Sequence, residues 1–97
     1  MKIVTLCGSL KFQNEMMKIT QDMALEGYCI LTPIYLTSNG INITTKQLLK
    51  EEHLKRIGLS DAILVVNVNN YIGESTNFEI EYAKKLGKEI MYYIEQK

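Results

Sequence analysis

The chain has 97 residues, 46% of them hydrophobic, and its eleven basic side chains balance eleven acidic ones. This length and composition predict one globular domain over residues 1–97. The sequence has no stripe of lysine and arginine that could bind along the backbone of a nucleic acid polymer, so we expect no such partner. No apolar run approaches the roughly 20 residues that cross a bilayer, and Gly8 interrupts the apolar start, so we expect no signal peptide, no membrane association and a cytosolic location.

The first third of the chain predicts a strand, a helix and a second strand. Residues Lys2–Cys7 form an apolar run typical of a buried strand, and residues 10–26 carry apolar side chains at nearly helical spacing. Gly27 is expected to end this helix. A short apolar strand over Tyr28–Thr32 then ends at the only proline, Pro33.

A loop and a second helix follow. Residues 34–43 show no sustained periodicity and predict a loop of about ten residues. Thr44 with Gln47 three residues later matches a capping box, which predicts a helix from there to about Ile57. Gly58 is expected to stop it.

The last third predicts a strand, a helix and a strand. Residues Asp61–Val68 are rich in valine and isoleucine, as strands covered on both faces are. A helix is expected to begin at Ser75 or Thr76 and to end at Gly87, and residues 89–94 predict the last strand.

This alternation of strands and helices predicts an α/β fold with a four-stranded parallel sheet in the order 2-1-3-4 and helices on both faces. Ligands of such sheets bind beyond the carboxyl ends of the strands, where the winding reverses between strands one and three. The segments 7–9 and 67–75 both open at that point.

The two cysteines, Cys7 and Cys29, each lie in or near a predicted strand. Neither has the close cysteine or histidine neighbours in the sequence that a zinc site requires, and a reducing compartment disfavours a disulfide. We therefore expect both to be small buried hydrophobic residues, and we expect neither a metal nor a cofactor.

The first candidate binding segment is Gly8-Ser9 at the predicted strand-to-helix junction. Backbone amides and the helix dipole can face an anion there, with the Ser9 hydroxyl and Lys11 as further donors. The same residues fit a tight turn in which Ser9 only caps the helix.

The second candidate is the polar segment before and within the third predicted helix. Thr76 and Glu79 match a capping box, in which Glu79 would only satisfy a backbone donor. One capping box does not need the other polar residues that gather there. The binding candidates in this segment are Asn67, Asn69, Tyr71, Gly73, Glu74, Ser75 and Asn77.

Residues 73–83 (GESTNFEIEYA), followed by Gly87-Lys88, resemble the signature of the nucleoside 2-deoxyribosyltransferase family. The resemblance covers most of the chain and implies a flavodoxin-like three-layer α/β/α fold. It implies that Glu79 is the nucleophile that attacks the anomeric carbon and holds a glycosyl-enzyme intermediate. A related branch of the family hydrolyses deoxynucleoside 5′-monophosphates, and its phosphate loop is similar to Gly8–Lys11.

The chain also departs from the family pattern. On a gapless reading back from Glu79, His53 takes the place of the aspartate that assists the base, and Gly73 that of the aspartate shortly before the nucleophile. The family enzymes continue beyond the fourth strand with a further strand and a tail that helps to complete the partner subunit's site. Leu49 and Ile57, four residues either side of His53, place it on or beside the apolar stripe of its helix, where a lone histidine is often a core residue. If it faces the site, it suits proton donation to a departing base.

Three functions remain open on these observations. The leading one is cleavage or transfer at the N-glycosidic bond of a nucleoside or nucleotide, with Glu79 and His53 as the catalytic candidates. The others are a nucleotide-binding or sensing module without catalysis, and an interaction protein whose glutamate is only a cap. Two sheet edges and a small core favour a homodimer or higher homo-oligomer.

Overall fold

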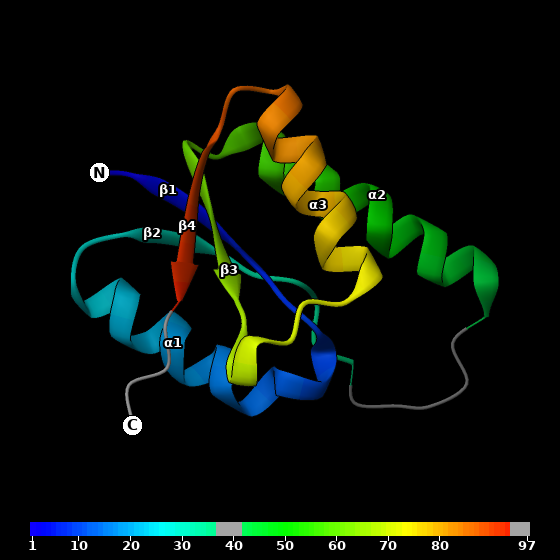
Figure 1. Ribbon diagram of the computed structural model, residues 1–97, viewed down its shortest axis with the longest axis horizontal. Coiled ribbons are helices and arrows are strands. Elements are labelled where there is room, and N and C mark those ends of the chain that lie inside the picture. The colour runs from blue at the N-terminus through cyan, green and yellow to red at the C-terminus, as the bar shows by residue number, and fades with distance from the viewer. Residues whose placement is uncertain (37–41, 94–97) are drawn as a thin grey trace.

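The computed structural model describes residues 1–36 and 42–93. Strands and helices alternate along the chain, as predicted (Figure 1). Two short 3-10 helices precede α1 and α3, at Leu10–Phe12 and Val68–Asn70. The strands and α-helices are β1 (Ile3–Cys7), α1 (Gln13–Leu25), β2 (Cys29–Leu31), α2 (Ile43–Leu59), β3 (Ala62–Val66), α3 (Glu74–Lys85) and β4 (Glu89–Tyr93).

The four strands form one parallel sheet in the order β2-β1-β3-β4, which confirms the predicted topology. β1 and β3 are neighbours in its centre, and their register sets Cys7 beside Val65. The two strands therefore end at the same level, so the loops that follow them open side by side at the reversal point of the winding.

Successive side chains of a strand point to opposite faces of the sheet, so the core consists of two hydrophobic clusters, one on each face. Leu6 of β1 and Leu64 of β3 pack with Met16 and Ile19 of α1 on one face of the sheet. On the other face, Cys7, Ile63 and Val65 pack against Ile57 of α2 and the α3 residues Ile80 and Ala83. The fold is thus the predicted three-layer α/β/α arrangement, with α1 covering one face and α2 and α3 the other (Figure 1).

The boundaries of α2 differ from the prediction at both ends. Asn42, not Thr44, caps the helix, because its side-chain oxygen accepts the backbone N–H of Thr45 at 2.8 Å. Gly58 does not stop it. The helix runs on to Leu59, since a helical glycine costs only about 1 kcal/mol and the packing of buried Ile57 outweighs that cost.

The start of α3 also differs, with a consequence for Glu79. The helix begins at Glu74 with Gly73 as its N-cap and no side-chain cap, and the N–H of Asn77 donates to the Gly73 carbonyl. Thr76 is therefore a buried residue of the first turn. The predicted capping box of Thr76 and Glu79 is wrong, and the Glu79 side chain is not engaged as a cap.

Cys29 corrects a further expectation, because it is exposed whereas Cys7 is buried. Its strand, β2, has only three residues and lies at an edge of the sheet, which leaves one side uncovered. Residues 37–41 of the predicted loop and Ile94 of the predicted last strand lie outside the described residues. Among the described helices, none is long and apolar enough to cross a membrane.

Candidate active site

A cleft of about 850 Å³ opens at the carboxyl ends of β1 and β3, between the loop after β1, helix α2 and the first turns of α3. It is where the topology places a ligand site. The structure brings eight of the predicted site residues to this cleft: Gly8, Ser9, His53, Tyr71, Gly73, Glu74, Ser75 and Glu79.

Four other predicted residues do not line the cleft. Lys11 is exposed, and its Nζ lies 3.4 Å from the centroid of the Tyr71 ring, so it covers a face of that ring. Asn69 and Asn77 are exposed away from the cleft. The side-chain oxygen of Asn67 is buried and has no hydrogen-bond partner among the described residues.

Tyr71 owes its place to an unusual backbone. Asn69 and Asn70, just before it, both have positive φ angles, of 54° and 61°. Asparagine tolerates this left-handed conformation better than other residues with a side chain, although each such residue is strained. The Tyr71 ring then meets Phe12 edge-on, with centroids 5.8 Å apart, at the mouth of the cleft.

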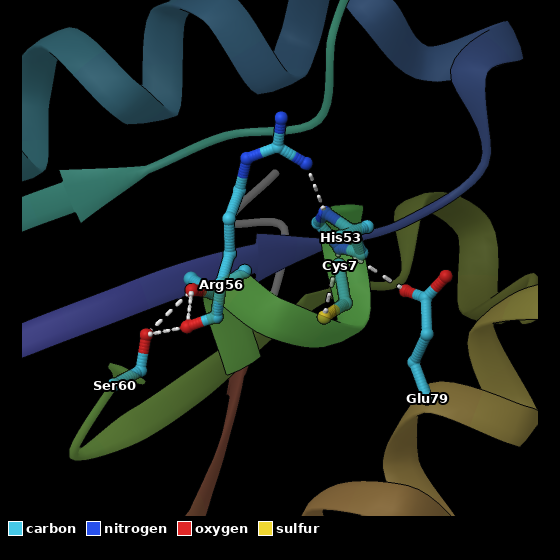
Figure 2. A network of polar contacts seen from close by, with 6 residues as sticks. Cys7, His53, Arg56, Ser60 and Glu79 are labelled. Carbon is cyan, nitrogen blue, oxygen red and sulfur yellow. Dashed lines mark hydrogen bonds and ion pairs between the residues drawn. The ribbon is translucent and has the colours of Figure 1, made fainter. Parts of the chain in front are cut away.

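Three side chains from three elements meet where His53 and Glu79 line the cleft (Figure 2). His53 Nε2 of α2 lies 3.4 Å from Glu79 Oε1 of α3 and 3.6 Å from Cys7 Sγ of β1. Cys7 reaches this point because it belongs to the strand positions that face α2 and α3. The His53 side chain is 8% exposed and the Glu79 side chain 17%, so the carboxylate is more open to a ligand than the imidazole.

Burial, reinforced by the negative charge of Glu79, raises the pKa of the Cys7 thiol well above its ordinary value. The thiolate is the reactive form of cysteine. Cys7 is therefore a neutral thiol beside Glu79 and not an activated nucleophile.

Arg56, one turn along α2, completes the cluster. Its NH1 lies 3.4 Å from Nδ1 of His53, the ring nitrogen that faces away from Glu79 (Figure 2). The backbone carbonyl of Arg56 accepts hydrogen bonds from the hydroxyls of Thr5, at 3.2 Å, and Ser60, at 2.8 Å. These bonds tie the end of α2 to β1 and so fix the helix that carries both His53 and Arg56.

The sulfur, nitrogen and oxygen atoms of Cys7, His53 and Glu79 all lie within 4.8 Å of one another, a donor set that suits a transition metal. The fold thus gives Cys7 the histidine neighbour that the sequence spacing lacked. A histidine nitrogen ligates a metal only through its lone pair. Because arginine can only donate, its contact with Nδ1 leaves the proton on Nε2, so a metal could bind here only after Arg56 moved away.

The sequence reasoning missed the basic wall of the cleft. Lys46, Lys50 and Arg56 line it from α2, and none forms an ion pair with another described residue. With His53 they recur at positions i, i+4, i+7 and i+10, which is one face of a helix. This spacing is visible in the sequence, and the choice of His53 as a site candidate could have led to the three basic residues on the same helix face. The other lining residues that were not predicted are Leu10, Pro33, Ile34, Leu36, Leu49, Thr76 and Phe78.

No protein-family model and no curated protein matches the chain. Solved structures do. The 2-deoxyribosyltransferase of Bacillus psychrosaccharolyticus superposes with a TM-score of 0.73 at 16% identity, over 97% of this chain and 77% of that one. The 2-deoxyribosyltransferase of Leishmania mexicana superposes with a TM-score of 0.67 at 22% identity, over 96% of this chain and 64% of that one.

The chain therefore has the fold of these two deoxyribosyltransferases, over about three quarters of the length of one and two thirds of the other. The resemblance read from residues 73–83 is confirmed at the level of the fold. Fold alone does not assign an activity, which must be argued from the site.

Proposed function

We propose that the protein cleaves the N-glycosidic bond of a nucleoside or nucleotide and transfers the sugar to water or to another base, with Glu79 as the nucleophile. The observation that carries the proposal is the position of Glu79. It is a partly buried carboxylate in the cleft, contacts His53, and has no role as a helix cap. The likeness of the fold to two deoxyribosyltransferases supports the same chemistry.

The reaction proceeds in two displacements. A carboxylate oxygen of Glu79 attacks the anomeric carbon, the bond from that carbon to the base nitrogen breaks, and its electron pair leaves with the base, which takes up a proton. The sugar is then held as an ester of Glu79. Water or a second base attacks the same carbon, the ester bond breaks, and the carboxylate is restored with overall retention of configuration.

The basic wall supports an anionic partner for this chemistry. Lys46, Lys50 and Arg56 present three positive charges to the cleft, whereas Glu74 and Glu79 line it from α3. Fixed cations stabilise the negative charge that develops on a departing base, and they also bind a phosphate. The Gly8-Ser9 loop also lines the cleft and is suited to offer backbone N–H groups to a 5′-phosphate.

Two aromatic rings, Tyr71 and Phe78, line the cleft and are 42% and 48% exposed. Exposed aromatic faces suit stacking on a flat heterocycle. Lys50 Nζ lies 4.4 Å from the Phe78 ring centroid, so this ring joins the basic wall. We propose that the base lies between these aromatic side chains and Glu79.

The decisive experiment follows base release by chromatography from a panel of deoxynucleosides and their 5′-monophosphates. Glu79→Gln keeps the shape of the side chain and removes the attacking oxyanion, so release should fall by about three orders of magnitude or more while ligand binding persists. Glu81→Gln is the matched control, because Glu81 lies on the same helix, is exposed and only contacts Lys84 at 3.5 Å. Equal release by wild type and Glu79→Gln would overturn the mechanism.

The basic wall also favours the second candidate, a module that binds nucleotides without turning them over, because three cations bind an anion whether or not chemistry follows. Calorimetric binding of a 5′-monophosphate by a wild-type protein that releases no base from any compound would select it.

We further propose that the protein works as a cytosolic homodimer. Within the described sheet, β2 and β4 are edges, and apolar Leu10 and Ile34 are exposed where they line the cleft. Light scattering after gel filtration tests the assembly, and a monomeric mass at micromolar concentration would contradict it.

A further inference from the structure

We infer that Arg56 fixes His53 as the tautomer with its proton on Nε2, and that His53 thereby acts as a positioning residue for Glu79 and not as the proton donor to the departing base. This inference rests on the proposed role of Glu79 as nucleophile.

The first step is the direction of the bond at Nδ1. A guanidinium has only N–H donors and no acceptor. The NH1 of Arg56, 3.4 Å from Nδ1 of His53, must therefore donate, and Nδ1 must accept through its lone pair. A neutral imidazole carries one proton, which leaves it on Nε2.

The second step is what the Nε2 proton faces. Its neighbours are Glu79 Oε1 at 3.4 Å and Cys7 Sγ at 3.6 Å. A carboxylate is a far better acceptor than a thiol, so the N–H is directed to Glu79. The opposite tautomer would turn a lone pair toward the carboxylate and an N–H toward the Arg56 guanidinium, and both contacts would be repulsive.

The third step is the consequence for the reaction. One oxygen of Glu79 is held by the ring, which leaves the other to approach the sugar in a fixed direction. Orientation of this kind is a large part of enzymatic rate enhancement, and a displacement of 1 Å can cost about 10²-fold. The only N–H of the ring is then engaged, so the proton for the departing base comes from water or from the basic wall.

The position of Arg56 is itself fixed, so it can hold His53 in this tautomer. Its backbone carbonyl accepts bonds from the hydroxyls of Thr5 and Ser60, which anchors it to β1. Its side chain reaches His53 across a single helical turn, so the arginine, the ring and the carboxylate form one line of donors and acceptors that ends at Glu79 (Figure 2).

The first test reads the tautomer directly and needs no activity. His53 is the only histidine in the chain, so long-range 1H–15N spectra of protein labelled at histidine contain one imidazole. In alkaline buffer we expect a protonated Nε2 and an unprotonated Nδ1. Arg56→Glu replaces a pure donor by a pure acceptor at Nδ1, which then competes with Glu79 at Nε2, so a measurable share of the proton should move to Nδ1. Lys55→Glu, an equal charge change at the neighbouring exposed position, should leave it on Nε2. A wild-type proton on Nδ1, or no change in Arg56→Glu, would overturn the inference.

The second test is a double-mutant cycle on base release with Arg56→Met and His53→Phe. If Arg56 acts through His53, each single variant should lower kcat by about 10²-fold, and the kcat of the double variant should fall no further than that of His53→Phe alone. KM should rise in both proteins that carry Arg56→Met, because Arg56 also lines the basic wall. Arg56→Lys, which keeps a donor, should recover part of the loss. Losses of kcat that multiply in the double variant, or a change confined to KM, would show that Arg56 acts only by binding substrate and would reject the positioning role.

The two tests also separate this inference from the proposed function. A protein that releases no base can still show the Nε2 proton and its transfer in Arg56→Glu, in which case only the proposed chemistry fails. Active protein with the proton on Nδ1 would retain the function of Glu79 and reject the role of Arg56.

Discussion

The two faces of the sheet differ in the polarity of the residues buried on them. The buried residues of the cluster on the α1 side are all apolar and include Val4, Leu6 and Met16. The four buried polar residues of the described chain, Thr5, His53, Ser60 and Thr76, belong to β1, to α2 and the residue that ends it, and to α3. Buried polar groups are costly unless they are hydrogen-bonded. The α1 face is therefore held mainly by apolar packing, whereas the buried polar residues with hydrogen-bond partners from different elements lie on the face that carries the cleft.

Leu6→Ala tests the apolar face and should have the largest effect on stability. Leu6 is fully buried against the α1 cluster, so its truncation should lower the free energy of unfolding by about 2–5 kcal/mol. Equilibrium urea denaturation measures this. Base release per folded molecule should not change, and a specific loss of turnover would break the division between the two faces.

Thr5→Val tests the polar face with a side chain of similar shape. The change removes the Thr5 hydroxyl, which contacts both the Arg56 carbonyl and the Ser60 hydroxyl, and should cost about 1–3 kcal/mol. It should also loosen α2 and reduce kcat, which Leu6→Ala should not do. Denaturation and turnover measured on the same samples decide between a purely structural and a shared role.

The Cys7 thiol predicts a pH dependence of stability on the cleft side. Because the folded pKa of Cys7 is raised above its ordinary 9.0, the folded protein retains a proton that the unfolded chain loses. This contribution to stability is complete below pH 9.0 and is lost as the pH rises toward the folded pKa, at up to about 1.4 kcal/mol per pH unit.

Urea denaturation of wild type and Cys7→Ala across this range measures the difference in slope. Thiol labelling gives an independent check, since exposed Cys29 should react at once and Cys7 only after denaturation. Parallel slopes for the two proteins, or rapid labelling of both cysteines, would show that Cys7 is not enclosed beside Glu79.

Asn69→Gly should have the smallest effect on stability. Its φ of 54° suits glycine without strain, and relief of that strain is offset by the greater freedom of the unfolded chain. We expect a change in unfolding free energy within about 1 kcal/mol, with Tyr71 still in place. A marked rise in KM would show that the asparagine side chain contributes to the cleft.

The fold could be predicted because the strands are short apolar runs that can be recognised from the local sequence. The run Ala62–Val66 is apolar at every position, as a strand covered on both faces must be, and Gly27 marks the end of α1 with a φ of 99°. The start of α3 could not be read in the same way, because Thr76 and Glu79 match a capping box in the sequence and only the position of Gly73 shows that the helix has already begun.

The part of the site that follows from strand order was predicted, and the part that depends on helix packing was not. Gly8, Ser9 and the residues around Glu79 follow from the topology, which places the ends of β1 and β3 together. The contact of Cys7 with His53 joins residues 46 positions apart and depends on how α2 packs across the sheet. Neither spacing nor composition encodes that packing, so the cluster became visible only with the fold.

Gly8 is the point at which the two faces meet. A Cβ atom there would lie 3.2 Å from both the Cβ and the carbonyl oxygen of Val66, and 3.3 Å from the sulfur of Met16 in the apolar cluster. The first residue of the cleft is thus wedged against the core that α1 covers. An added Cβ at position 8 would require the Val66 backbone and the Met16 sulfur to give by a few tenths of an ångström. Substitutions that alter the cleft without disturbing this core are therefore expected at Ser9 and beyond, and not at Gly8.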